Sequence, residues 1–144
     1  MSATPEDFPA TRVYATRWTD NDMYGHLNNA VYYQLFDTMI NGWLAANAAV
    51  DPAAGEVVNV VAESGCRFFA EVGFPADVTV GLRVARLGSS SVTYELALFD
   101  DEAVCAAEGK WVHVYVDART RRPTPIPADV REALQVLAGA TRSE

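Results

Sequence analysis

Residues 17 to 37 read RWTDNDMYGHLNNAVYYQLFD, and this stretch decides the fold. Two carboxylates, Asp20 and Asp22, stand one residue apart in a polar turn, and an apolar helical pattern follows directly. The first turn of a helix has backbone N–H groups without intrahelical partners, and these attract negative charge. A carboxylate beside a helix N-terminus therefore places a base or nucleophile next to a site for an oxyanion, which is what acyl transfer requires.

The same turn has an ordinary structural explanation. Asp and Asn form turns readily, and either residue can cap a helix without any further role. The density of polar side chains between two apolar segments favours a catalytic role. The frequent use of the same residue types as helix caps favours a purely structural role. Taken alone, the residues leave catalysis and capping equally open.

The segments around this turn predict one strand, one long helix and then four more strands. Arg12 to Arg17 alternates like a first strand. An apolar stripe from Tyr32 to Leu44 predicts a helix of about four turns, closed by an Ala-rich end and Asp51-Pro52. Further strands are expected at Val57–Phe69, Val78–Val84, Val92–Leu98 and Ala103–Asp117, and a terminal helix at 128–138.

The turns between these later strands are short, at Phe74-Pro75, Gly88 to Ser91 and Asp100-Asp101. Short turns favour antiparallel hairpins. The order predicts an α+β fold, in which an antiparallel five-stranded sheet wraps around one long helix and a short C-terminal helix follows. No linker or internal repeat interrupts residues 1–144, so we expect a single domain.

Composition excludes several classes of function. The formal net charge of −8 disfavours nucleic acid as a partner, because phosphate binding needs a basic field. No apolar run is long enough for a membrane span, and the first residues do not resemble a signal peptide. Cys66 and Cys105 have no metal or redox spacing, so we expect reduced thiols, no metal site, no bound cofactor and a cytoplasmic protein.

An open five-stranded sheet with one covering helix leaves two edges and apolar surface exposed. Pairing two such sheets edge to edge removes an edge and buries that surface. The architecture therefore predicts a homodimer with twofold symmetry, with assembly to a homotetramer as a further possibility.

The turn also resembles the signature of hotdog-fold thioesterases. The D-x-D-x-x-G pattern from Asp20 to Gly25 is similar to 4-hydroxybenzoyl-CoA thioesterase, and H-x-N-N from His26 to Asn29, followed by an aromatic helix, is similar to acyl-ACP thioesterases. The resemblance covers about residues 10 to 130 and includes the ending VHVYVDARTRRPTPIP at 112–127. It implies a hotdog fold, a dimer with active sites at the subunit interface, and a thioester of CoA or of acyl carrier protein as substrate.

The resemblance implies roles for four side chains in or near the turn. Asp22 matches the essential carboxylate of the first family, as nucleophile or as general base. His26 matches the histidine of the second and could orient water, bind substrate or supply a proton. Tyr24 stands where the acyl-ACP enzymes carry Asn, and His26 stands where the other enzyme has an aliphatic residue. The pattern is therefore intermediate, with Tyr24 and Gly25 as candidate substrate contacts.

Three further groups are candidates for the site. Backbone amides near Asn29, at the predicted helix start, would polarise the carbonyl, with the side chains of Asn28 and Asn29 as possible caps. Glu63 is an acid in an otherwise apolar strand, which predicts partial burial and a raised pKa, or else an exposed strand face. The densest basic cluster, Arg119, Arg121 and Arg122, is the candidate for binding CoA phosphates.

These observations predict an acyl-CoA thioesterase that hydrolyses a thioester to a carboxylic acid and free CoA. A hotdog hydratase or dehydratase is one alternative, although those enzymes resemble D-x-N-P-x-H at the turn and this chain has no such Asn-Pro. A non-catalytic acyl-CoA-binding protein is the other.

Overall fold

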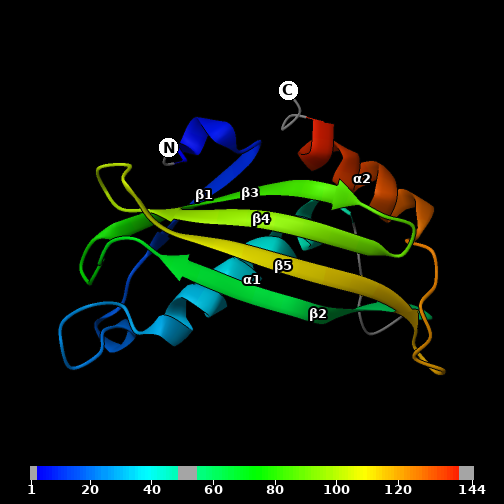
Figure 1. Ribbon diagram of the computed structural model, residues 1–144, viewed down its shortest axis with the longest axis horizontal. Helices are drawn as coiled ribbons and strands as arrows, with labels where there is room; N and C mark the ends of the chain where they lie inside the picture. The colour runs from blue at the N-terminus through cyan, green and yellow to red at the C-terminus, as the bar shows by residue number, and fades with distance from the viewer. Residues whose placement is uncertain (1–2, 49–54, 140–144) are drawn as a thin grey trace.

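A computed structural model describes residues 3–48 and 55–139 of the chain. Five strands form one antiparallel sheet in the order β1-β3-β4-β5-β2 (Figure 1). The strands are β1 (Ala10–Ala15), β2 (Val57–Phe68), β3 (Asp77–Leu87), β4 (Ser91–Phe99) and β5 (Cys105–Asp117), and the helices are α1 (Asn29–Asn47) and α2 (Ala128–Gly139). The predicted order of one strand, one helix, four strands and a terminal helix is confirmed.

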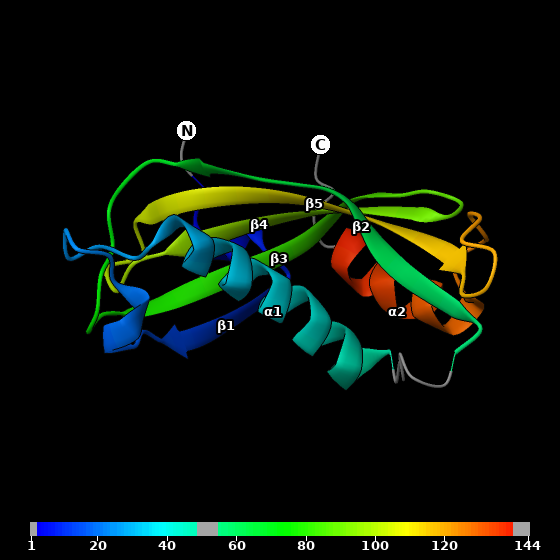
Figure 2. The ribbon, with the colours of Figure 1, turned by 90° about the horizontal axis from the view of Figure 1, so that it is seen from below.

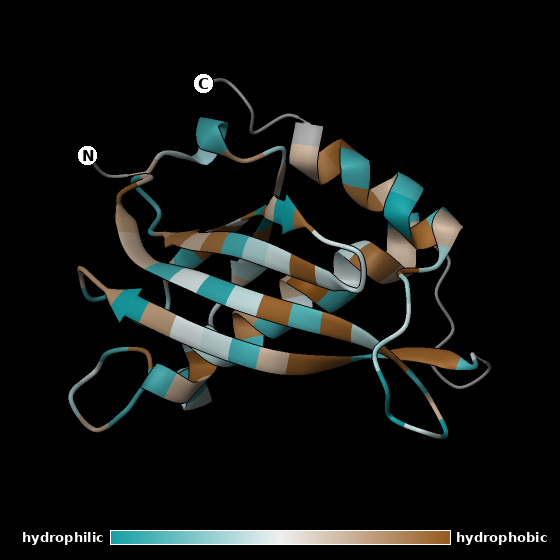
Figure 3. Ribbon diagram, turned by 45° about the vertical axis from the view of Figure 1, so that its right-hand side comes forward, coloured by the Kyte–Doolittle hydropathy of each residue, from teal (hydrophilic) through white to brown (hydrophobic). Residues whose placement is uncertain are grey.

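The central strands β3 and β4 bury their apolar side chains on one face of the sheet. Val78, Val80 and Leu82 of β3 alternate with more polar residues, and β4 does the same (Figure 3). Alternation of period two places all apolar side chains of a strand on one side of the sheet. Both helices pack on that side (Figure 2), and their buried residues join those of the strands in one core cluster.

Helix α1 has 19 residues, about five turns rather than the predicted four. It starts earlier than the apolar stripe because Asn28 caps it, accepting the N–H of Ala30 through Oδ1 at 2.9 Å. Phe36 and Ile40 on its buried face are fully enclosed. The predicted closing signal, Asp51-Pro52, lies outside the described residues.

The first strand was predicted at Arg12 to Arg17, and the structure places it at Ala10–Ala15. The chain leaves the sheet at Arg17 because that residue starts a short 3-10 helix, Trp18–Asp20. The N–H of Arg17 donates to the Asp20 carboxylate at 2.7 Å, so it is not available to a neighbouring strand. Local side-chain hydrogen bonds thus overrode the alternating pattern.

Strand β2 lies at one edge of the sheet, and the alternation of its side chains between the two faces shifts by one residue along its length. Its register against β5 shifts between Val61, which faces His113, and Glu63, which faces Val112. Ala62 is thus the additional residue of a β-bulge. Residues opposite each other in an antiparallel pair share a face, so Val61 lies on the α1 side of the sheet and Glu63 on the other.

A second, smaller apolar cluster covers part of the opposite face. Phe8 packs edge-on against Phe99, with ring centroids 6.0 Å apart, and the Arg83 guanidinium lies 4.6 Å from the centre of the Phe8 ring. The N-terminal segment therefore closes one end of the face that α1 and α2 leave open. Among the described helices, none is long and apolar enough to cross a membrane.

Candidate active site

The polar turn folds around the carboxylate of Asp22. Its Oδ1 accepts the backbone N–H of Tyr24 at 2.9 Å and that of His26 at 3.3 Å. The backbone closes the same loop, with the N–H of Asp22 donating to the His26 carbonyl at 2.8 Å and that of Gly25 to the Asp22 carbonyl at 3.1 Å. One carboxylate oxygen is therefore occupied in holding the turn, and a carboxylate has a second oxygen for chemistry.

Glycine is required at the tip of this turn. Gly25 has φ +84°, in the left-handed region that side chains disfavour. Its carbonyl oxygen lies only 2.4 Å from the position of a Cβ added to Gly73, so the two backbone segments touch. Sequence reasoning predicted a turn at Phe74-Pro75 but did not connect it with the turn that holds Asp22.

Two hydrogen bonds fasten the turn to the segment after β2. The N–H of Leu27 donates to the carbonyl of Val72 at 2.7 Å, and the N–H of Phe74 donates to Oδ1 of Asn21 at 3.0 Å. The position of Asp22 is thus fixed by residues some fifty places later in the chain. This distance in sequence explains why local patterns could not predict the contact.

Asp20 has a different role from Asp22. It is buried, and its carboxylate forms an ion pair with Arg17, with Nη2 and Oδ1 2.9 Å apart. Burial acts to raise the pKa of Asp20, but hydrogen bonds and charge from Arg17 outweigh it and leave the pKa below its usual value. The carbonyl of Asp20 also accepts the N–H of Asn28 at 2.9 Å. Asp20 therefore shapes the turn and positions the start of α1.

The start of α1 presents a backbone donor to the site. Asn28 satisfies two amides, accepting Ala30 N–H through its side chain and Val31 N–H through its carbonyl. No acceptor for the N–H of Asn29 is present within residues 3–48 and 55–139. Asn28 is thus the cap, whereas the amide of Asn29 is the one available to polarise a carbonyl.

Asp22 and Asn29 open onto the same surface pocket, which has a volume of about 460 Å³. Tyr32 and Phe68 form an aromatic wall, with their rings edge to face and 5.0 Å apart. Burial raises the pKa of Tyr32, and the nearby carboxylates of Glu71 and Asp22 add to the effect, so this phenol stays protonated. The lining is completed by Tyr24, His26, Leu27, Ala70 and Glu71.

Sequence reasoning missed Glu71. Its Oε1 lies 3.2 Å from Nε2 of His26, so a carboxylate holds the imidazole at the rim of the pocket. Both side chains are largely exposed, at 41% for His26 and 74% for Glu71. The available signal was the acid in FFAEVGFP, directly after β2, but nothing local indicates that this segment returns to the turn.

Glu63 does not line this pocket. Its side chain is 58% exposed, and its Oε2 lies 3.4 Å from Nζ of Lys110. Of the two readings expected for Glu63, the structure shows the exposed strand face and not partial burial. The bulge at Ala62 turns its side chain to the face of the sheet away from α1. Its catalytic role stays a prediction, now without the burial that motivated it.

The basic cluster lies at the other end of β2. Arg119 lines a separate pocket with Glu56 and Asp117, and Asp117 pairs with Val57 at the beginning of the strand. Phe68, in the Asp22 pocket, is the last residue of β2. The strand spans roughly 36 Å at the usual rise of about 3.3 Å per residue, so one protomer separates the arginines from the turn by that length.

Within the described residues, no three His, Cys, Asp or Glu side chains gather as metal ligands. The predicted absence of a metal therefore stays a prediction about the whole chain.

Comparison with known proteins identifies the family. Residues 16–134 match the model of the thioesterase-like superfamily. The chain belongs to this superfamily. A search of curated proteins found no match to this chain.

Solved structures support the same assignment. The PA5185 protein of Pseudomonas aeruginosa is 47% identical, with 94% of this chain and 95% of that one covered and a TM-score of 0.89. PA2801, a putative thioesterase of the same organism, is 32% identical, with 88% and 98% covered and a TM-score of 0.81. A Thermus thermophilus thioesterase complexed with coenzyme A and Zn is 30% identical, with 93% and 98% covered and a TM-score of 0.74.

These thioesterase-like relatives confirm the predicted hotdog fold. A 1,4-dihydroxy-2-naphthoyl-CoA thioesterase from Synechocystis shares it at only 17% identity and a TM-score of 0.81, with 87% of this chain and 94% of that one covered. At that identity the likeness concerns the fold alone. The predicted resemblance of the turn to thioesterases is likewise confirmed at the level of the superfamily.

Proposed function

We propose that the protein is an acyl-CoA thioesterase that uses Asp22 at the start of α1. The observation that carries the proposal is the pocket of about 460 Å³ that Asp22 and Asn29 both line. A base or nucleophile and an oxyanion donor facing one cavity are the parts that thioester hydrolysis needs. A relative at 30% identity is complexed with coenzyme A, which supports CoA as the carrier.

In the general-base form of the reaction, Asp22 takes a proton from water. The resulting hydroxide adds to the thioester carbon, and the oxyanion of the tetrahedral intermediate accepts the N–H of Asn29. Collapse of the intermediate breaks the C–S bond, and the Asp22 carboxyl returns its proton to the departing thiolate. In the nucleophilic form, an Asp22 oxygen attacks the thioester carbon and the C–S bond breaks, which releases the CoA thiolate and leaves a mixed anhydride. Water then hydrolyses the anhydride, which returns the Asp22 carboxylate and the carboxylic acid, and the proton released in this step neutralises the thiolate.

The turn gives Asp22 a fixed position for either form. Backbone donors from Tyr24 and His26 hold one carboxylate oxygen, so the other is presented in a defined direction. His26, oriented by Glu71, lies at the rim, where it is placed to hydrogen-bond the substrate. The acyl group would lie against Tyr32 and Phe68.

The proposal includes a homodimer formed along the free edge of β2. Within the part of the chain that the structure describes, this strand pairs only with β5, and it exposes Val60, Val61 and Phe68 at 38%, 51% and 45%. An edge strand with exposed apolar residues is a template for pairing with a second chain. Antiparallel pairing would bring the beginning of β2 in one copy to the end of β2 in the other.

Such a dimer would also bring the basic cluster close to an Asp22 pocket. Arg119, Arg121 and Arg122 lie far from the turn of their own protomer but near the beginning of β2. In the antiparallel dimer they approach the Asp22 pocket of the second copy. The cluster could then hold the CoA phosphates in an otherwise acidic protein.

A thiol-release assay over a panel of acyl-CoAs tests the function. We expect hydrolysis by the wild type and a kcat at least about a hundredfold lower for Asp22→Asn, the lower range for loss of a general base. Asp101→Asn, in the exposed β4–β5 turn, is the matched control and should keep full activity. Binding of acyl-CoA without turnover, or hydration of an enoyl-CoA in place of hydrolysis, would refute the proposal.

A further inference from the structure

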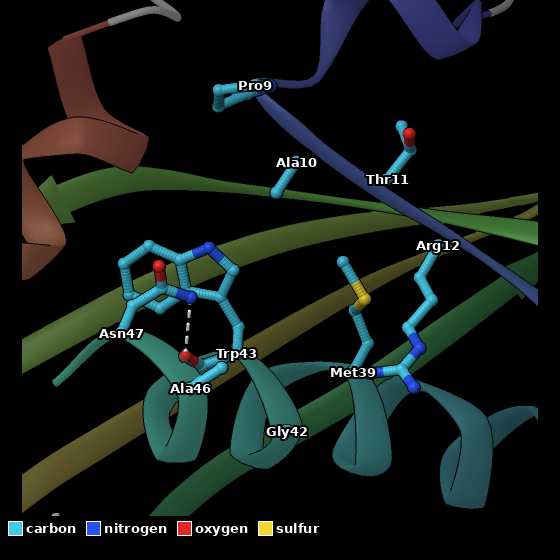
Figure 4. A pocket seen from close by; sticks show the side chains of 9 residues that line it. All are labelled: Pro9, Ala10, Thr11, Arg12, Met39, Gly42, Trp43, Ala46 and Asn47. Carbon is cyan, nitrogen blue, oxygen red and sulfur yellow. Dashed lines mark hydrogen bonds between the residues drawn. The ribbon is translucent and has the colours of Figure 1, made fainter. Parts of the chain in front are cut away.

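A second groove lies between β1 and α1, away from the Asp22 pocket (Figure 4). Its volume is about 410 Å³, within the usual range for small-molecule sites. None of its residues lines the Asp22 pocket. Along α1, the groove at Gly42 is roughly 20 Å from Asn29 at about 1.5 Å per residue. The groove is formed by Pro9, Ala10, Thr11, Arg12, Met39, Gly42, Trp43, Ala46 and Asn47.

Gly42 forms the floor of this groove, and packing does not require a glycine there. A Cβ at this position would meet only Nη1 of Arg12, at 4.0 Å, and the residue has no positive φ. Glycine inside a helix costs about 0.5–1 kcal/mol relative to alanine. The space above Gly42 is thus open at a position where alanine would stabilise the helix.

The groove is apolar along most of its length. Met39 and Trp43 line it from α1, and Figure 4 shows the Trp43 indole lying across the end opposite Arg12. The Met39 side chain is held by the Tyr14 hydroxyl, which donates to its sulfur at 3.6 Å, whereas the Asn47 side chain donates to the backbone carbonyl of Trp43 at 2.9 Å.

Arg12 brings a positive charge to the other end. Its guanidinium lies 5.7 Å from the Tyr14 ring, and in the described part of the chain it has no ion pair with a carboxylate. Among the described residues that line the groove there is no Asp or Glu, although the chain has a formal net charge of −8. The charge is thus free to attract an anion, and the adjoining surface accepts an apolar body.

We propose that this groove binds an amphipathic monocarboxylate, with its carboxylate at Arg12 and its aliphatic chain over Gly42 toward Trp43. The stretch of α1 from Met39 to Ala46 is about 11 Å long at 1.5 Å per residue, which suits a medium-length chain. The proposal does not depend on thioester hydrolysis, since the groove and the Asp22 pocket share no residue.

Octanoate is the probe, and the amide and indole N–H resonances of the ¹⁵N-labelled full chain are the readout. Trp43→Phe assigns the Trp43 indole signal. We expect octanoate to shift the Trp43 indole and the Gly42 amide in a saturable way, with Kd at or below about 1 mM. Neutral octanamide, which cannot pair with Arg12, should bind at least about fivefold more weakly.

Two variants and a control separate charge from shape. Arg12→Gln should weaken octanoate binding about tenfold, and Gly42→Leu should abolish it by filling the floor. Arg86→Gln removes an exposed arginine outside the groove and should change nothing. If Gly42→Leu does not fold, Arg12→Gln against Arg86→Gln decides the question.

Several results would overturn the proposal. Shifts confined to Tyr24 and Asn29 would place octanoate in the Asp22 pocket instead. Equal binding of octanamide, or of octanoate by Arg12→Gln, would remove the role of the charge. Groove resonances that depend on protein concentration but not on octanoate would show contact between two copies of the chain. No saturable shift by about 10 mM would show that the groove is not a binding site for this class.

Discussion

The carbonyl oxygen of Gly25 occupies the space that a side chain on Gly73 would need. An added Cβ would lie 2.4 Å from that oxygen, and backbone cannot move aside as the end of a flexible side chain can. The turn that carries Asp22 is therefore positioned by the segment that follows β2.

Gly73→Ala should displace the turn and lower kcat/KM by about ten- to a hundredfold, because small misplacements of a reacting group are costly. The melting temperature should fall as well, since two hydrogen bonds cross the same contact. Asp101→Ala, in the exposed β4–β5 turn, is the control. Equal activity of both variants would show that the turn adjusts without consequence.

A charge on the free edge of β2 should prevent the proposed assembly. We expect the wild type to be a dimer or tetramer at micromolar concentration, and Val61→Lys to shift it toward monomer. Val61 is 51% exposed, so lysine costs little in the isolated protomer. Light scattering measures the mass directly, and Val136→Lys, on the exposed side of α2, serves as the control. A stable wild-type monomer would refute both the dimer and a site shared between copies.

The basic cluster should affect binding of CoA and leave the chemical step alone. Replacing Arg121 and Arg122 by Ala should raise KM for acyl-CoA with kcat nearly unchanged, because contacts made equally in ground and transition states do not alter kcat. The difference from wild type should shrink as salt is added. A short thioester without the nucleotide should be hydrolysed equally by both proteins. An unchanged KM would assign these arginines to solvated surface.

His113 should make the fold sensitive to mild acid. It is buried under α1, and within the described chain neither ring nitrogen has a hydrogen-bond partner. Burial lowers the pKa of His113, an effect that the charge of Asp37 only partly opposes. Between this lowered pKa and the unfolded value of about 6.5, the unfolded state binds more protons than the native state. Stability should therefore fall as the pH drops below about 6.5.

Urea unfolding at pH 7.5 and 5.5 measures the effect. The loss for one proton is at most about 1.4 kcal/mol per pH unit. His113→Phe should lose much of this pH dependence, whereas His26→Gln, on the surface, should keep it. A wild type equally stable at both values would mean that His113 accepts a proton in place.

Local patterns predicted much of this molecule. Alternation placed β3 and β4, the apolar stripe placed α1, and the density of polar groups marked the turn around Asp22. These features depend on neighbours within a few residues, which a sequence displays directly. The capping role of Asn28 and the exposed amide of Asn29 follow from the same local geometry.

Contacts between distant segments could not be predicted in this way. The pairing of His26 with Glu71 and the contact of Gly25 with Gly73 depend on where the chain returns after β2. The face of the sheet on which Glu63 lies depends on a bulge that cannot be recognised in the apolar run VVNVVAESG. The position of the arginine cluster relative to the turn also depends on β2. The cluster lies near the beginning of this strand and the Asp22 pocket at its end, so the two are far apart within one protomer.

The bulge at Ala62 is the point at which β2 can change its length by one residue without exchanging its two faces. Before it, odd-numbered residues such as Asn59 and Val61 pair with the helix-facing residues of β5, and after it even-numbered ones such as Ser64 do so. Deleting Ala62 would remove the bulge and leave the later pairs in place, with Glu63 still opposite Val112 and Phe68 still on the side of Tyr32. Loss of a residue from the paired stretch that follows would instead shift part of β2 by one position, and such a shift moves side chains to the other face of the sheet.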